Sequence, residues 1–144
     1  MNRIFLDSNL LVAIFMRADP NHHLVSDWLN GMAGSSLFYV SPQIIAETYA
    51  TITSPTKFQK PLTPKQARVG LVNFLSAKEL NLMPIGETAI TSALTAAEDK
   101  NKKSRQIFDL LIWGTMVENG IKTIATFNAR DFQNLSGIKV MVPG

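Results

Sequence analysis

The sequence predicts an α/β fold with three layers, in which helices cover both faces of a central, mostly parallel sheet. Apolar runs of strand length recur along the chain, and longer segments with helical periodicity separate them. This alternation is typical of parallel sheets, because a parallel pair of strands needs a crossover connection that is usually a helix.

The expected strands are short and apolar. They are residues 4–6, 37–40, 80–84, 122–126 and 138–142. No glycine-rich phosphate loop follows the first of them, so the fold is Rossmann-like only in a loose sense and does not carry the signature of a dinucleotide-binding protein.

Capping residues locate several of the expected helices. Asp19-Pro20, Ser41-Pro42 and Thr63-Pro64 each place a capping side chain before a proline, which is favoured in the first helical turn. The expected helices are residues 10–16, 20–32, 42–52, 65–77, 87–100 and 105–118. The last is apolar on nearly every side, which predicts an interior position. Trp28 and Trp113 recur with other apolar residues at helical spacing and are assigned to the core rather than to base stacking.

Composition limits the classes of function. The 144 residues predict a single domain, 1–144, and the absence of cysteine excludes disulfides, thiolate zinc sites and a cysteine nucleophile. The longest apolar run, Leu10 to Met16, is far shorter than the ~20 residues that span a membrane. Asp7 interrupts the apolar stretch that a signal peptide would need, so we expect a cytoplasmic protein. The formal charge of +3 permits a polyanionic partner.

Acidic and polar residues from distant segments are expected at one edge of the sheet. Asp7 closes the first strand, Glu47 lies in the second turn of the helix after the second strand, and Asp109 lies early in the interior helix. Asn128 and Asp131 follow the fourth strand. Ligands bind beyond the carboxyl ends of parallel strands, so these side chains are predicted to converge.

A divalent cation would explain this convergence. The three acids lie among apolar neighbours, where a carboxylate is costly to bury unless it is paired or binds a metal. Apart from Arg105, no basic residue nearby in sequence is an obvious partner, and clustered carboxylates raise one another's pKa. Oxygen ligands without cysteine or a suitably placed histidine favour Mg²⁺ or Mn²⁺ over zinc.

Each of these residues also has an ordinary structural explanation that the sequence leaves open. Asp7 is suited to cap the helix that follows it, and Glu47 alone fits a partly exposed helix acid. Asp109 can pair with Arg105 one turn earlier. Taken alone, residues 128–131 are best explained as a helix cap followed by an acid at the third position. The metal-site hypothesis therefore depends on all four segments meeting.

At these residues the sequence resembles the PIN-domain family, and within it the VapC-type toxin ribonucleases of bacterial toxin–antitoxin pairs. Four motifs carry the resemblance in the family's order, at residues 4–11 (IFLDSNLL), 41–47 (SPQIIAE), 108–112 (FDLLI) and 125–132 (ATFNARDF). The resemblance implies a PIN-like fold and metal-dependent hydrolysis of RNA phosphodiester bonds. The chain departs from the family pattern at Asn128, where many members have an acid, and Asp131 is close enough to compensate.

The resemblance also implies roles for individual residues. The expected catalytic residues are Asp7, Glu47, Asp109, Asn128 and Asp131, and the first three are the expected ligands of Mg²⁺ or Mn²⁺. Asn128 and Asp131 would support a weaker second metal position. Ser8, Asn9 and Thr126 are expected to hydrogen-bond the carboxylates and hold their rotamers.

Partners follow from the same hypothesis. An acidic pocket repels RNA, so cations must surround it. The candidate phosphate contacts are Arg105, Lys57, Lys60, Lys102 and Lys103. The neighbouring Lys65, Arg68 and Lys100 flank the same two expected loops. Arg105 is favoured because one turn separates it from Asp109. The resemblance further implies a small antitoxin protein that covers the pocket, and a homodimer.

Two other functions remain open. A Rossmann-like phosphohydrolase would use Asp7 as a nucleophile, but such enzymes usually carry a second acid where this chain has Asn9. A catalytically degenerate member of the family would act as a binding module, because Asn128 removes one charge from the site.

Overall fold

The computed structural model describes all residues from 1 to 144 and contains a five-stranded parallel sheet. The strand order is β3-β2-β1-β4-β5. The strands are β1 (Asn2–Leu6), β2 (Ser36–Val40), β3 (Leu80–Leu82), β4 (Thr123–Ala125) and β5 (Lys139–Met141). Every neighbouring pair is parallel, which confirms the predicted α/β class and sharpens "mostly parallel" to entirely parallel.

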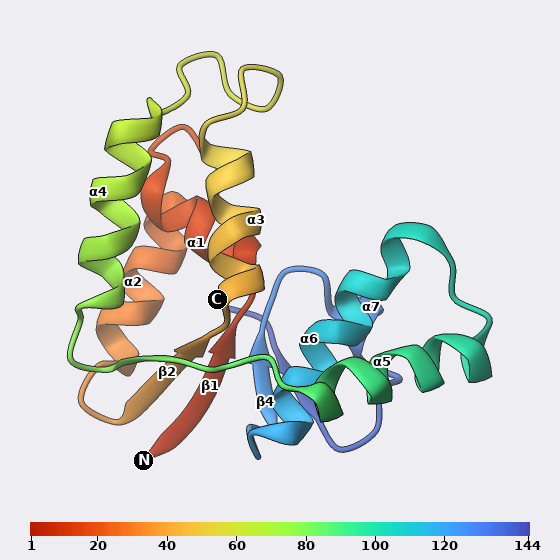
Figure 1. The fold of residues 1–144 in the computed structure, drawn as a ribbon. Helices are drawn as coiled ribbons and strands as arrows, with labels where there is room; N and C mark the ends of the chain where they lie inside the picture. Colours follow the sequence, from red (N-terminus) through yellow and green to blue (C-terminus); the bar gives the residue numbers. More distant parts are fainter.

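Helices form two groups on either side of the sheet (Figure 1). The first group is α1 (Ser8–Phe15), α2 (His22–Met32), α3 (Pro42–Ile52) and α4 (Pro64–Leu75). The second is α5 (Glu87–Lys100), the 3₁₀ turn η1 (Ser104–Gln106), α6 (Ile107–Glu118) and α7 (Ala129–Phe132). The predicted three-layer arrangement is therefore present.

The central strand β1 determines where a ligand can bind. It pairs with β2 on one side and β4 on the other, with Ile4 opposite both Phe38 and Thr123. The chain runs outward from β1 to β2 and β3, then crosses back to β4 and β5. The strand order thus reverses between β1 and β4, and ligands of open parallel sheets bind beyond the carboxyl ends of the strands at such a point.

Local chemistry explains two of the predicted helix starts. The Ser41 hydroxyl accepts a hydrogen bond from the Ile44 N–H at 3.5 Å, at the start of α3. Thr63 and Gln66 form a reciprocal capping box at the start of α4. A loop connects these two helices, as expected from the ends of the predicted helices 42–52 and 65–77.

The predicted helix start at Asp19-Pro20 is wrong. Helix α2 begins at His22, with Asn21 at its N-cap position. The Asp19 carboxylate instead accepts a hydrogen bond from the Asn21 N–H at 2.8 Å. Asp bonding to the backbone two residues later makes a turn, so Pro20 lies in that turn and not in the helix.

Helix α6 is only partly interior. It buries Leu110, Ile112 and Met116, but Phe108 and Val117 are 42% and 47% exposed. The prediction of burial on nearly every side is therefore wrong for these two residues. Helix α5 packs closely against α6 at Gly114, where a Cβ would collide with the Ala89 carbonyl.

No helix is both long and apolar enough to span a membrane.

Candidate active site

Asp7 directly follows the carboxyl end of β1. It therefore lies at the point between β1 and β4 where the strand order reverses. Its side chain is only 5% exposed, and both carboxylate oxygens accept hydrogen bonds. The Ser8 N–H donates to Oδ1 at 2.8 Å, and the Thr126 hydroxyl donates to Oδ2 at 2.7 Å. Desolvation raises the pKa of Asp7 above its usual value, although these two hydrogen bonds oppose the rise. Asp7 therefore caps α1, as the structural explanation requires, and still carries a perturbed carboxyl group.

A small hydrogen-bond network fixes Asp7 against the end of β4. Besides donating to Asp7, the Thr126 hydroxyl accepts hydrogen bonds from Asn9 Nδ2 at 3.3 Å and from the Asn128 N–H at 2.9 Å. The side-chain oxygen of Asn9, Oδ1, accepts a hydrogen bond from the Phe127 N–H at 3.4 Å. Thr126 and the Ser8 backbone thus contact the Asp7 carboxylate directly, whereas Asn9 bonds Thr126 and the Phe127 N–H and reaches no carboxylate. Contacts of this kind restrict the rotamers of a carboxylate, and the supporting roles of these residues stay a prediction.

Glu47 approaches from α3 with one unsatisfied oxygen. Its Oε2 atom is buried without a hydrogen-bond partner, and so is Oε1 of Gln43, one turn earlier on the same helix. Desolvation raises the pKa of Glu47, Gln43 counters this by hydrogen bonding, and the charge of Asp7 raises it further. The charge of Arg105 lowers it slightly, so the guanidinium also lies within electrostatic range.

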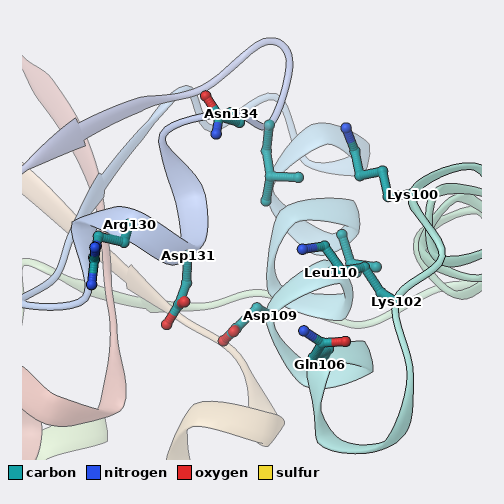
Figure 2. A pocket seen from close by; sticks show the side chains of 9 residues that line it. Lys100, Lys102, Gln106, Asp109, Leu110, Arg130, Asp131 and Asn134 are labelled. Atoms are coloured by element: carbon teal, nitrogen blue, oxygen red, sulfur yellow. The ribbon is translucent and has the colours of Figure 1, made fainter.

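Asp109 carries the largest perturbation. Desolvation, followed by the charges of Asp131, Asp7 and Glu47, raises its pKa from 3.8 to about 6. Figure 2 shows the carboxylates of Asp109 on α6 and Asp131 on α7 pointing toward one another. Carboxylates from β1, α3, α6 and α7 therefore occupy a common electrostatic environment. Arg105 does not neutralise Asp109 one turn away, because its guanidinium lies over the ring of Phe108 instead.

Asn128 and Asp131 have different positions. Asn128 is exposed and occupies the N-cap position of α7, but its side chain makes no capping hydrogen bond, so the preferred capping explanation is not realised through that side chain. Asp131 lies in the first turn of α7 and raises the pKa of both Asp7 and Asp109. Its charge is the one that acts on the other carboxylates.

A cavity of about 430 Å³ adjoins the acids (Figure 2). Asp109 and Asp131 line it, whereas Asp7 and Glu47 do not. The other lining residues are Lys100, Lys102, Arg130, Gln106, Asn134, Leu110 and Leu135. Positively charged residues and carboxylates therefore line the same cavity.

Only some of the predicted cations lie at this cavity. Lys102 lines it, while Lys103 does not, and Lys57 and Lys60 belong to the exposed loop that follows α3. Arg130, Gln106 and Asn134 also line the cavity, but they were not predicted from the sequence as site residues. For Arg130, the one available signal was its position next to Asp131 in the fourth motif.

The oxygen atoms of these side chains suit a cation that keeps its water molecules better than one coordinated directly by several carboxylates. No group of three or more acidic or histidine side chains has the arrangement needed to hold a metal ion directly. However, the buried acceptors Glu47 Oε2 and Gln43 Oε1 lack donors, and water molecules around a cation would supply them. Mg²⁺ usually keeps several of its waters and uses one or two carboxylates. The roles of Asp7, Glu47 and Asp109 as metal ligands stay a prediction.

Together, the fold and the site define an α/β protein with an acidic pocket at the switch point of a parallel sheet. A family model described as the PIN domain matches residues 4–138, and the chain belongs to the PIN-domain family. PIN and VapC proteins are nucleases. The family predicted from the four motifs is thus confirmed.

Solved structures of VapC-type proteins share this fold. VapBC2 from Rickettsia felis, solved with a DNA fragment from its promoter, has a TM-score of 0.71 at 18% identity, with 99% of each chain covered. The Mycobacterium tuberculosis VapC20, a sarcin-ricin loop cleaving toxin, has a TM-score of 0.70 at 12% identity, covering 89% of this chain and 92% of that one. DNA-bound VapBC from Salmonella typhimurium has a TM-score of 0.69 at 19% identity, covering 99% and 98%. A search of curated proteins finds none that matches the sequence.

Proposed function

We propose that the chain is a metal-dependent ribonuclease that acts as one PIN-like domain and serves as the toxin of a toxin–antitoxin pair. One observation carries the proposal: at the point where the strand order reverses, burial and then the charges of neighbouring acids raise the pKa of Asp7, Glu47 and Asp109. Such a cluster of negative charge is unfavourable unless a cation offsets it. Acidic clusters with perturbed pKa values are typical of functional sites.

The residues have distinct tasks in this proposal. Asp7 and Asp109 hold a Mg²⁺ or Mn²⁺ ion, directly or through water, and Glu47 completes the site or orients the attacking water. A bound divalent ion supplies charge neutralisation at the phosphoryl oxygens and makes water a better nucleophile. Asp131 provides the fourth negative charge, which Asn128 lacks, and supports any second metal position.

Positive residues beside the acids provide a path for RNA. Lys100, Lys102 and Arg130 line the cavity that Asp109 and Asp131 also line, so phosphates next to the one being cleaved can be neutralised there. Arg105 serves the neighbouring side of the site, near Glu47. Lys57, Lys60 and Lys103 would contact only RNA that extends beyond the cavity.

The two alternative functions receive less support. Phosphohydrolases with a nucleophilic Asp usually carry a second acid two residues later, where this chain has Asn9. The Asn9 side chain bonds Thr126 and the Phe127 N–H. A degenerate binding module would lack the negative charge that many family members have at the position of Asn128. Here the charge of Asp131 acts on Asp109, so the cluster is not short of that charge.

A protein partner has a suitable surface on the other side of α3. A groove of about 750 Å³ lies between α3 and α4, and its lining is mainly apolar, with Lys65 and Arg68 among the lining residues. One structural neighbour is a toxin–antitoxin complex from Klebsiella pneumoniae, and another is a member of the VapBC family of toxin–antitoxin systems. We propose that a small antitoxin covers this chain with apolar side chains in the groove, and that the toxin itself pairs as a homodimer.

Incubation of the purified chain with total cellular RNA tests the proposed activity. We expect cleavage with Mg²⁺ or Mn²⁺, no cleavage with EDTA, and loss of cleavage in Asp7→Asn, which keeps a capping side chain at that position. Asp27→Asn, an exposed acid on α2, is the matched control and should cleave normally. Sequencing of the fragment ends would identify the cleavage position. EDTA-resistant cleavage, or full activity of Asp7→Asn at saturating Mg²⁺, would contradict the proposal.

A further inference from the structure

Phe108 is an exposed aromatic residue at the edge of the acidic site. It directly precedes Asp109 on α6 and remains 42% exposed. The two other phenylalanines near the site are more enclosed, because Phe132 is fully buried and Phe127 packs against the core. Phe108 is therefore the phenylalanine next to the carboxylates that presents a large part of its ring to solvent.

The backbone at Phe108 is anchored to the helix that carries Glu47. Gln43 Nε2 donates a hydrogen bond to the Phe108 carbonyl at 3.0 Å, across 65 residues of sequence. Gln43 lies one turn before Glu47 on α3. This bond joins the start of α6 to α3, so the backbone of Phe108 lies at the boundary between the two carboxylate-bearing helices.

A cation supports the same ring. The Arg105 guanidinium carbon lies 5.5 Å from the centroid of the Phe108 ring. A cation over an aromatic ring is attracted to the ring face even at an exposed position, which biases the rotamers of both side chains. The charge of Arg105 also lowers the pKa of Glu47, so the guanidinium lies within electrostatic range of the acidic site.

We propose that Phe108, supported by Arg105, is a stacking platform for an unpaired base of the RNA next to the cleaved phosphate. The role rests on the ribonuclease function proposed above and specifies its substrate class as single-stranded RNA or an unpaired loop. Aromatic side chains and Arg planes bind splayed bases by stacking, whereas bases inside a duplex already stack on their neighbours. The positive charge of Arg105 is placed to meet the phosphate attached to the stacked base.

Fluorescence anisotropy with a short single-stranded RNA oligonucleotide tests this role. The measurement uses the full chain in the Asp7→Asn background with Mg²⁺, so that the RNA stays intact. Phe108→Ala should weaken binding roughly 5- to 150-fold, the loss expected for one base–aromatic stack. Phe108→Trp should restore binding. The slope of affinity against salt concentration should not change, because no phosphate contact is removed.

Three controls separate stacking from other effects. Val117→Ala removes a similarly exposed apolar side chain at the far end of α6 and should leave binding unchanged. A duplex of the same sequence, and an oligonucleotide lacking bases, should bind Phe108→Ala and the parent protein equally. Equal losses in Phe108→Ala and Val117→Ala, or losses that persist with the abasic oligonucleotide, would overturn the proposal.

The outcome can be distinguished from failure of the ribonuclease itself. If the chain with its native Asp7 cleaves no RNA, the proposed function fails whatever Phe108 does. If it cleaves RNA but Phe108→Ala has unchanged binding and unchanged KM for single strands, only the stacking role fails. Altered self-association of Phe108→Ala with intact RNA binding would identify Phe108 as a protein contact and would likewise refute stacking.

Discussion

Asp109→Asn should stabilise the metal-free protein at alkaline pH, although it removes a proposed catalytic group. The pKa of Asp109 is raised from 3.8 to about 6, so the ionised form destabilises the folded state relative to the unfolded chain. At about 1.4 kcal/mol per pKa unit this corresponds to roughly 3 kcal/mol. The side chain is only half-buried and solvent screens its charge, so we expect about 1–1.5 kcal/mol, or a Tm increase of roughly 3–5 °C.

The pH dependence has a definite sign. Between 3.8 and about 6, the folded protein holds a proton on Asp109 that the unfolded chain has released, so this group's contribution to stability is lost as pH rises through about 6. The advantage of Asp109→Asn over the native chain should therefore be largest near pH 8 and shrink as pH falls toward 4. Bound Mg²⁺ should reverse the order, because it stabilises the native chain more than the variant.

Thermal and urea unfolding in EDTA, at several pH values and then with Mg²⁺, measures these effects. Asp27→Asn on α2 is the control for replacing an exposed carboxylate and should show little change in stability at any pH. Two results would contradict a raised pKa of Asp109: lower stability of Asp109→Asn than of the native chain in EDTA at pH 8, or a stability difference that does not depend on pH.

Three further predictions follow from individual contacts. Thr126→Val deletes the hydroxyl that donates to Asp7, and should lower stability by about 1–3 kcal/mol and weaken Mn²⁺ affinity in calorimetry by roughly 10–100-fold; unaltered Mn²⁺ binding would refute the linkage. Asp131→Asn should reduce RNA cleavage at least about tenfold, whereas Asn128→Ala should have a much smaller effect, and the reverse order would assign the fourth position to Asn128. Gly114→Ala should destabilise the chain by about 1–3 kcal/mol in urea unfolding, because the added Cβ collides with a carbonyl of α5, and native stability would show that the two helices separate easily.

Much of the fold could be predicted because its signals are local. Alternating strands and helices follow from hydrophobic periodicity, and Ser41 and Thr63 begin helices through capping bonds that span three residues. The grouping of Asp7, Glu47 and Asp109 could also be anticipated, since parallel strands bring their carboxyl ends to the same edge. The mutual pKa effects of these acids agree with that expectation.

Other features depended on contacts that the sequence does not display. Asp19 had the composition of a helix cap, but its carboxylate closes a turn two residues later. The interior character assigned to α6 failed at Phe108 and Val117, because an apolar composition does not say how many sides a neighbour covers. Arg130 was missed as a cavity residue because α7 is too short to show a periodic pattern.

The sequence by itself determined the alternation of strands and helices along the chain and the capping of α3 and α4, and it predicted which acids lie toward one edge of the sheet. These depend on hydrophobic spacing, short-range hydrogen bonds and the geometry common to all parallel sheets. Only the tertiary structure decided that the charge of Asp131 acts on Asp7 and Asp109, and that Arg105 lies over Phe108 instead of pairing with Asp109. Electrostatic coupling depends on separation in space and on burial, and both arise only when distant segments pack together.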